Sequence, residues 1–481
     1  MTVLAASPVI IISATSVVAM MAGLFGSRVV RRDGPAAAGL LGIVAALIMS
    51  AVLWGDRQEA LGGGYRADRF SLLFNLIILT AAGVTLLLSW RESAGVDRRG
   101  EYAGLILVAA AGMMLVVGAG DLITLFLGIE ILSVALYVLC ALEVWRERSL
   151  EAGLKYLIVG AVGSSILLYG LTFLFGAVGS TRLEVIGGAL SEPGGSTEPL
   201  VLVAMALIAA GLAFKSSAAP FHMWTPDVYE GAPTPITAFM ATATKAVALA
   251  AFLRIFGGAL VGLVDDWQIA IAAVAVASIV IGNLAALVQT SMKRMLAYSS
   301  VAQAGYLLTG VAAGTLNGSR AVLYYLLAYT AMTLAAFAIV VIREREVENG
   351  ESIAALSGYG RTRPVLGMVL TVALLSLAGF PPLSGFIGKF LLFGAAVDAD
   401  LTWLAVVGAI GSMVSLGYYL RVLSTLWTGD SPDPARDKNL AVPGPVGIAT
   451  LSCGIAVVAI SLATSPLLAM CQGAAEALIA P

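Results

Sequence analysis

The chain has 481 residues, of which 59% are hydrophobic and only 12% charged, and its mean hydropathy is +0.96. Because so little polar surface cannot cover a soluble globule, we expect a polytopic all-α membrane protein, with residues 1–481 forming one membrane domain in a lipid bilayer. The formal net charge of −2 provides no basic patch, so nucleic acid is not an expected partner.

Cysteine and glycine motifs exclude several kinds of site. Cys140, Cys453 and Cys471 are scattered among apolar residues without CxxC spacing, which argues against an iron–sulfur cluster, a zinc site or a disulfide framework. The sequence also contains neither a Walker loop nor a GxGxxG fingerprint. We therefore expect no cofactor in this chain, and any redox chemistry or nucleotide binding to belong to other chains.

Apolar segments long enough to cross a bilayer recur along the whole chain. The first, near the N-terminus, has no basic n-region, and we interpret it as a helix and not as a cleaved signal peptide. We expect fourteen segments, near residues 6–27, 36–54, 70–90, 102–118, 121–142, 152–177, 200–219, 233–256, 267–289, 295–313, 319–342, 363–397, 402–426 and 444–470.

Basic residues sort the connections between these segments. The odd-numbered connections hold Arg28, Arg31, Arg32, Arg91, Arg98, Arg99, Arg146, Arg148, Lys293, Arg294, Arg343, Arg345, Arg361, Arg363, Arg436 and Lys438. The even-numbered connections hold Arg57, Arg66, Arg69, Arg182 and Arg320. The positive-inside rule then places the odd connections in the cytoplasm and both termini on the outer side.

Proline and glycine interrupt two of the segments. The seventh is broken at Pro220, and the twelfth, too long for one straight helix, is broken in the stretch GFPPLSG at 379–385. Proline removes a helical hydrogen bond and clashes with the preceding turn, so we predict that both helices are discontinuous.

The two breaks are five segments apart, which fits two inverted five-helix repeats of the kind found in transporters. Residues 1–118 would hold helices one to three and, from about 102, the start of the first repeat. The first repeat would cover 102–256, the second 267–426, and the last helix 444–470.

Charged residues within the segments point to an ion path. Lysines in a hydrocarbon layer cost roughly 2.5–3.5 kcal/mol and usually mark such paths, and burial lets a lysine release its proton, which arginine does not do. Three lie deep, Lys215, Lys245 and Lys389, and Glu130 is the only deep carboxylate. A structural ion pair is the alternative, but three lysines cannot share one acid. We therefore predict that these four residues translocate protons.

Each deep residue receives a predicted role. Glu130 pairs with Lys215, Lys389 forms the exit, and Lys245 relays protons between the halves. The hydroxyls of Thr242 and Thr244 would assist that relay.

The remaining polar residues leave two interpretations open. Lys155 either takes part in the path or snorkels to the interface, and His222 either relays a proton or caps a helix. A polar patch on the tenth segment either joins helices or lines a water path; it consists of Tyr298, Ser299, Ser300 and Gln303. Asp227 and Glu230 are expected to stay solvated at the cytoplasmic surface.

Three stretches carry a family resemblance: WTPDVYEGAPTPITAFMATATKAVALAAFLRIF, MKRMLAYSSVAQAGYLLTGV and SLAGFPPLSGFIGKFLLF. In residues, order and spacing they resemble subunit N of bacterial respiratory complex I, the NADH–quinone oxidoreductase, over segments four to thirteen. The resemblance implies fourteen helices and two proton half-channels. It matches Glu130 to the family's fifth-helix glutamate, and Lys215, Lys245 and Lys389 to its lysines of helices seven, eight and twelve.

The resemblance also implies a setting. Proton translocation would be coupled to electron transfer from NADH to quinone in other subunits, which would hold NADH, FMN, iron–sulfur clusters and quinone. Membrane-arm subunits M, J and K would be the neighbours, in a bacterial inner (cell) membrane. Subunit M differs in carrying a glutamate where Lys389 stands, and subunit L in continuing into a lateral helix. The second repeat departs from the first, because its tenth segment has no deep acid and its thirteenth only Arg421.

Two other functions use related chains. One is a subunit of a multi-subunit sodium/proton antiporter, which has the same fold without redox chemistry. The other is a redox pump fed by ferredoxin, formate or a deazaflavin, whose donor binds elsewhere.

Overall fold

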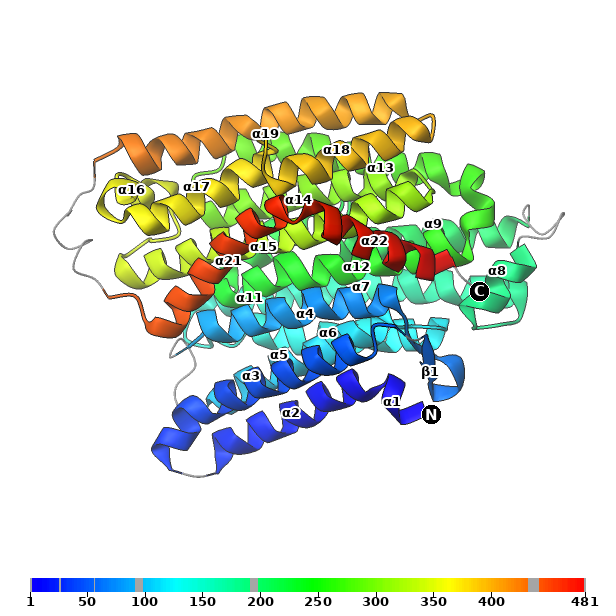
Figure 1. Ribbon diagram of the computed structural model, residues 1–481, viewed down its shortest axis with the longest axis horizontal. Coiled ribbons are helices and arrows are strands. Elements are labelled where there is room, and N and C mark those ends of the chain that lie inside the picture. Colours follow the sequence, from blue (N-terminus) through cyan, green and yellow to red (C-terminus); the bar gives the residue numbers. More distant parts are fainter. Residues whose placement is uncertain are drawn as a thin grey trace.

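Long helices run roughly parallel to one another through the whole molecule in the computed structural model (Figure 1). The structure describes residues 2–25, 27–55, 57–90, 98–190, 198–430 and 441–479. Arg91, Arg436 and Lys438, which we assigned to odd-numbered connections, lie outside these residues.

The helices of the first half correspond to the first eight expected segments. They are α1 (Thr2–Ala5), α2 (Ser7–Leu24), α3 (Arg28–Val52), α4 (Arg69–Leu88), α5 (Arg99–Val117), α6 (Leu122–Cys140), α7 (Glu147–Val178), α8 (Leu183–Leu190), α9 (Pro199–Lys215), α10 (Trp224–Gly231), α11 (Thr234–Phe239) and α12 (Lys245–Phe252). A short hairpin, β1 (Gln58–Ala60) with β2 (Tyr65–Ala67), precedes α4.

The second half contains the remaining segments. Its helices are α13 (Val264–Leu287), α14 (Met292–Ala312), α15 (Leu316–Glu346), α16 (Tyr359–Thr362), α17 (Pro364–Ala378), α18 (Ser384–Asp398), α19 (Thr402–Thr428), α21 (Gly444–Leu462) and α22 (Thr464–Ile479). Among the described residues, eleven helices are long and apolar enough to cross a membrane. Together with α14 and the two broken segments, they occupy all fourteen expected positions.

Both predicted breaks are present. In the seventh segment α9 ends at Lys215 and α10 begins only at Trp224; in the twelfth α17 ends at Ala378 and α18 begins at Ser384. Gly379 ends α17 with φ +85°, a left-handed conformation that favours glycine. The predicted inverted relation of the two repeats remains a prediction.

The eighth segment is not a plain α-helix. Two π-helical turns, Met240–Thr244 and Leu253–Ala259, lie on either side of α12, so that Lys245 directly follows the first of them. Such turns occur frequently at functional sites and widen the helix locally. Nothing in the sequence of the expected span 233–256 indicated these π-helical turns.

The last segment also differs from expectation. A single helix was predicted over 444–470, but α21 ends at Leu462 and a second helix, α22, continues to Ile479. Pro466 explains the interruption, because it cannot donate the hydrogen bond that would continue α21 and its ring clashes with the preceding turn.

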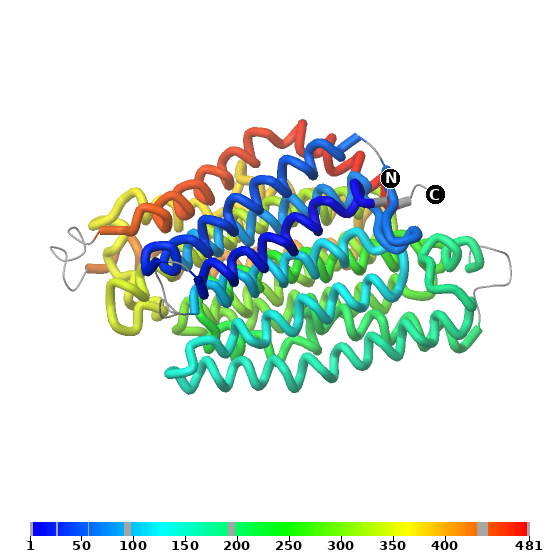
Figure 2. Tube along the Cα trace, turned by 90° about the horizontal axis from the view of Figure 1, so that it is seen from below, coloured from blue at the N-terminus to red at the C-terminus, as the bar shows by residue number. Residues whose placement is uncertain are grey.

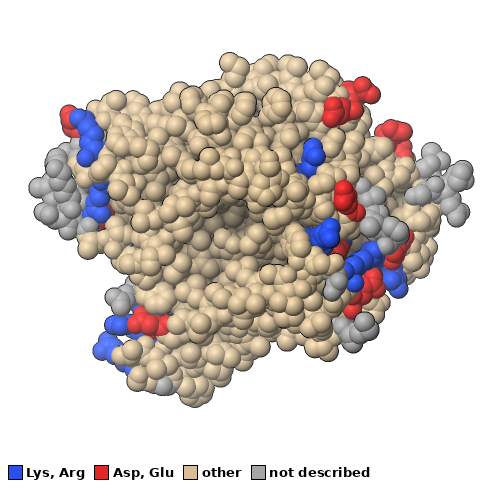
Figure 3. All heavy atoms as spheres, in the orientation of Figure 1, with Lys and Arg blue, Asp and Glu red and all other residues tan. Residues whose placement is uncertain are grey.

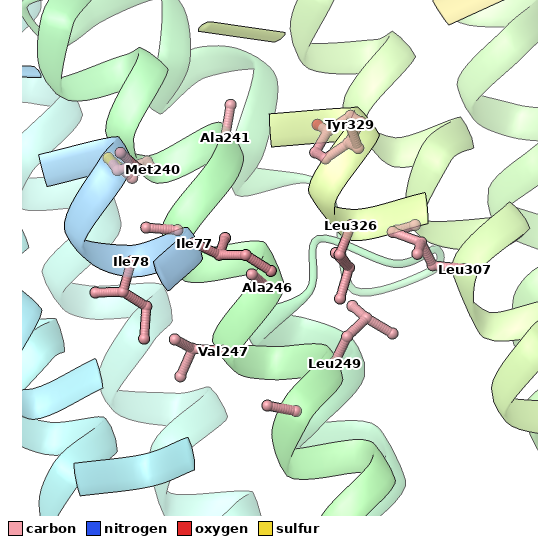
Figure 4. Packing of buried hydrophobic residues seen from close by; sticks show 14 of the residues in the cluster. Ile77, Ile78, Met240, Ala241, Ala246, Val247, Leu249, Leu307, Leu326 and Tyr329 are labelled. Carbon is pink, nitrogen blue, oxygen red and sulfur yellow. The ribbon is translucent and has the colours of Figure 1, made fainter. Parts of the chain in front are cut away.

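The eighth and eleventh segments form the centre of the bundle. In each, 94% of the residues in the apolar stretch are buried. Figure 4 shows how side chains of the eighth segment, among them Met240, Val247 and Leu249, pack between Ile78 of α4 and Leu326 of α15. The central position of the eighth segment carries Lys245 into the core.

Charged side chains gather at the two ends of the visible face in Figure 3, and a broad band between them carries almost none. This is the pattern of a bilayer-spanning bundle. Both termini lie at one end, beside the β1–β2 hairpin and α8 (Figures 1 and 2). An even number of crossings requires this arrangement.

A buried ion pair stabilises the end of the bundle at which the termini lie. Arg254 contacts both carboxylate oxygens of Asp68 at 2.8 and 2.9 Å, donates to the carbonyl of Val117, and stacks over Phe70. The Asp68 carboxylate also accepts a hydrogen bond from the backbone N–H of Ser71 and so acts as the N-cap of α4. The pair therefore joins α4, α5 and the eighth segment.

An Asp68→Asn variant is expected to destabilise the fold by about 3–5 kcal/mol, because it leaves the Arg254 charge buried without a counter-charge. Asparagine is itself a good N-cap, so loss of the cap is not the cause. The thermal unfolding midpoint of the solubilised assembly measures the effect. Glu184→Gln, which removes a more exposed partner of Arg66, is the matched control and should cost less than about 1 kcal/mol. Equal midpoints for the two variants would contradict the prediction.

Candidate functional site

Three buried lysines lie along the middle of the bundle. The exposed fractions of Lys215, Lys245 and Lys389 are 9%, 1% and 3%. Each ammonium group donates hydrogen bonds to neutral oxygens, as described below. None of the three is in a direct ion pair within the described residues, so their charges are not locked by a carboxylate.

Lys215, the last residue of α9, donates to the hydroxyl of Ser133 on α6 at 2.9 Å. Glu130 lies one turn before Ser133 on the same face of α6 and interacts electrostatically with Lys215. One carboxylate oxygen of Glu130 is buried without a hydrogen-bond partner. In this structure Lys215 therefore bonds to a hydroxyl and not to Glu130, and the functional pairing of Glu130 with Lys215 remains a prediction.

Lys245 is held by two backbone carbonyls, those of Ser216 and Ser300, each at 2.8 Å. Ser216 follows Lys215 in the chain, so Lys245 contacts the break in the seventh segment. Thr242 and Thr244 do not serve Lys245 in this structure, because their hydroxyls donate to carbonyls one turn back in their own helix.

Lys389 on α18 closes the end of α17. Its ammonium donates to the carbonyls of Leu377 and Ala378 at 2.9 and 3.2 Å and to the Ser412 hydroxyl at 3.0 Å, and it lies 4.6 Å from the centre of the Tyr306 ring. Free carbonyls at a helix C-terminus carry partial negative charge and favour a cation. The helix break itself therefore supplies the site for this lysine.

One turn of α14 connects the last two lysines. Ser300 holds Lys245 through its carbonyl, and three residues later Gln303 donates to the carbonyl of Leu377 at 3.2 Å, the same oxygen that Lys389 binds. Tyr325 donates to the side-chain oxygen of Gln303. Residues 300 and 303, one turn apart on α14, thus link the surroundings of Lys245 and Lys389.

The polar patch on α14 makes contacts between helices. Ser299 bonds to Tyr419 and Ser300 accepts from Tyr329, while Tyr298 packs against His222 and Arg294. The patch therefore joins helices, the first of its two interpretations.

Lys155 reaches the surface. Its side chain is 42% exposed and forms ion pairs with Glu151 at 2.7 Å and Asp227 at 3.0 Å. Asp227 and Glu230 both contact Arg294, so these acids are ion-paired and not simply solvated as expected. These contacts favour the snorkelling interpretation of Lys155.

His222 lies in the break of the seventh segment. Its Nδ1 is buried without a hydrogen-bond partner, and its backbone carbonyl, not its ring, accepts from the amide of Thr225. No side chain caps α10. The capping interpretation is therefore not supported, and the relay interpretation remains a prediction.

Sequence reasoning missed one buried lysine. Lys293 was assigned to a loop beside Arg294, but its side chain is fully buried in the first turn of α14. Its position at the start of a segment, next to Arg294, carried no signal of this burial. The described residues contain no cluster of three or more metal-ligating side chains.

Comparison with known proteins defines the class. A family model described as "NADH:quinone oxidoreductase/Mrp antiporter, TM" matches residues 119–415. Curated relatives named NADH-quinone oxidoreductase subunit N include one from Trichlorobacter lovleyi, 40% identical over 86% of this chain and 85% of its own length. Another, from Rhodospirillum rubrum, is 40% identical over 98% of this chain and 97% of its own.

Solved structures agree on the fold. A chain of respiratory complex I from Thermus thermophilus with bound aureothin has a TM-score of 0.81 and 35% identity, and the match covers 96% of this chain and 98% of that one. A chain of the Mrp complex from Dietzia sp. has a TM-score of 0.82 at 23% identity, covering 99% of this chain and 98% of that one, and shares the fold.

The fold and the row of buried lysines, Lys215, Lys245 and Lys389, define an antiporter-like membrane subunit. Within that class, the chain belongs to the subunit N family of NADH-quinone oxidoreductases, as the resemblance of its motifs predicted. The expected fold class and family are therefore confirmed.

Proposed function

We propose that this chain translocates protons as a membrane subunit of an NADH–quinone oxidoreductase, coupled to electron transfer in partner subunits. The observation that carries the proposal is the polar connection from Lys215 to Lys389. Lys245 donates to the carbonyl of Ser216, the residue after Lys215, and to the carbonyl of Ser300 on α14. One turn later on α14, Gln303 donates to the carbonyl of Leu377, which also accepts from Lys389.

Proton transfer along this row needs lysines that can lose their charge. Lysine does so when buried, and hydrogen-bonded carbonyls and hydroxyls allow both the ammonium and the neutral amine to be held. Glu130 with Lys215 takes up the proton in the first half, Lys245 relays it, and Lys389 releases it. Ser133, one turn after Glu130 on α6, accepts from Lys215 and donates to the carbonyl of Ile129.

The setting follows from the same proposal. NADH, FMN, iron–sulfur clusters and quinone bind in partner subunits, and the neighbours are subunits M, J and K. The membrane is the bacterial inner membrane, with the termini and the β1–β2 hairpin on its outer side. Isolating the assembly and supplying NADH, reduced ferredoxin, formate or a reduced deazaflavin in turn tests the donor. Quinone reduction by NADH alone supports the proposal, and reduction only by another donor contradicts it.

A Glu130→Gln variant is expected to slow proton uptake about twofold or more while leaving assembly intact, since glutamine keeps the shape but neither binds nor releases the proton. Proton uptake into membrane vesicles, normalised to the amount of assembled subunit, measures the effect. The control is Glu184→Gln, which changes an acid in the first turn of α8. Normal uptake by Glu130→Gln would remove Glu130 from the path.

A further inference from the structure

Lys293 is a buried lysine that the proposed route does not use. Its side chain is fully buried in the first turn of α14, where the positive end of the helix dipole disfavours a cation and burial adds to the cost. Its neighbour Arg294 shows the alternative, because it reaches Asp227 and Glu230 near the surface. A charge in so unfavourable a place calls for a reason.

The partners of Lys293 lie on two other helices. Its ammonium donates to the carbonyl of Ala232, just after α10, at 2.9 Å, and Glu344 in the last turn of α15 lies 3.7 Å away. Glu344 is 23% exposed. A carboxylate with access to water therefore stands directly before a lysine that has none.

Glu344 lines a polar cavity of about 650 Å³ at the predicted cytoplasmic end of the bundle. Glu143, Arg146 and Glu348 also line it. A cavity of this size and polarity accommodates many water molecules. Water can therefore deliver protons to Glu344, and Glu344 is the contact between the cavity and Lys293.

Hydroxyl-bearing residues lie on both sides of Ala232, whose carbonyl accepts from Lys293. Thr234, which also lines the cavity, has a buried hydroxyl without a partner, a position where an ordered water is expected. Tyr229, 1% exposed, lies against the side chain of Ser300. Ser300 lies two turns after Lys293, about 10 Å along α14 and on the same face, and its carbonyl holds Lys245.

We propose that Lys293 is a second proton-uptake residue, which receives protons from the cavity through Glu344 and passes them by way of Tyr229 and Ser300 to Lys245. This inference rests on the proposed proton translocation and adds a branch that bypasses Glu130 and Lys215. In each transfer the Glu344 carboxyl gives its proton to the Lys293 amine, the Lys293 ammonium gives a proton through ordered water to the hydroxyls of Tyr229 and Ser300, and the Ser300 hydroxyl passes one through water to the Lys245 amine. Only protons move, so charge and atoms balance.

Variants of the whole assembly in membrane vesicles test the branch. Lys293→Arg keeps the cation and its hydrogen bond to Ala232 but cannot release a proton, and Glu344→Gln keeps the shape but cannot carry one. Each is expected to slow donor-driven proton uptake about twofold, because the branch through Glu130 and Lys215 still operates, and each combined with Glu130→Gln is expected to slow it at least about tenfold. Arg361→Gln is the control, because it removes an exposed basic side chain from the same end of the bundle without touching the cavity.

The outcomes separate this inference from the proposed function. Normal uptake by Lys293→Arg, with loss only in Lys293→Met, identifies a structural cation and overturns the branch. Normal uptake by Glu344→Gln overturns it as well. Lys245→Arg tests the shared endpoint: if it pumps normally, the proposed route fails; if it is impaired while Lys293→Arg is normal, only the branch fails.

Discussion

A Lys389→Met variant is expected to lower proton output about 10²-fold or more, the scale of a missing acid–base group. Lys389 is the last lysine of the row, and its ammonium is the donor shared by the carbonyls of Leu377 and Ala378. Methionine fills the space but carries no proton. Proton release from vesicles, measured beside electron transfer from the donor to an artificial acceptor, shows whether only the membrane part is affected.

Loss of hydrogen bonds at the end of α17 is the competing explanation for a defect in that variant. Lys389→Arg separates the two, because arginine still donates to the carbonyls and still stacks on Tyr306 but stays charged. We expect Lys389→Arg to be as defective as Lys389→Met. If the arginine variant releases protons normally, Lys389 serves to hold the break and the exit lies elsewhere.

The broken helices were predictable because proline and glycine act locally. Pro220 and the stretch from Gly379 to Gly385 prevent a continuous helix whatever surrounds them, and the structure breaks at both. The burial of Lys215, Lys245 and Lys389 followed equally from the apolar residues around them. Local chemistry thus determined the places of the breaks and the depth of the lysines.

The partners of the lysines were not predictable in the same way. The oxygens that hold Lys245 and Lys389 are mostly backbone carbonyls, which every residue has, so no letter of the sequence marks them. The contact of Ser133 with Lys215 depends on how α6 packs against α9, so the sequence around Ser133 did not indicate it. The π-helical turn before Lys245 depends on the whole surrounding core, and the break at Leu462 was overlooked although Pro466 indicated it.

The sites of Lys245 and Lys389 share one structural feature. Breaking a helix frees carbonyl groups, and a lysine occupies them: Lys245 of the eighth segment at Ser216, and Lys389 of the second half of the same broken segment at Leu377 and Ala378. Carbonyl dipoles stabilise the ammonium without a full counter-charge. A small shift of either helix therefore changes the proton affinity of the lysine, which a direct ion pair would resist.

Lys245→Arg is expected to abolish most proton translocation while the assembly remains intact. Of Lys215, Lys245 and Lys389, Lys245 is the one that contacts both halves, through the carbonyls of Ser216 and Ser300. Arginine keeps a cation at those carbonyls but does not titrate, so a relay that depends on proton release stops, with uptake falling about 10²-fold.

The measurement is proton uptake per assembled complex, with Lys245→Ala compared under the same conditions. Both variants should fail if Lys245 must gain and lose a proton. If the arginine variant pumps normally and only the alanine variant fails, the site needs a fixed charge, and the relay must run through other groups. If both pump normally, the connection between the halves does not pass through Lys245, and the contacts of Ser300 and Gln303 on α14 then have a purely structural role.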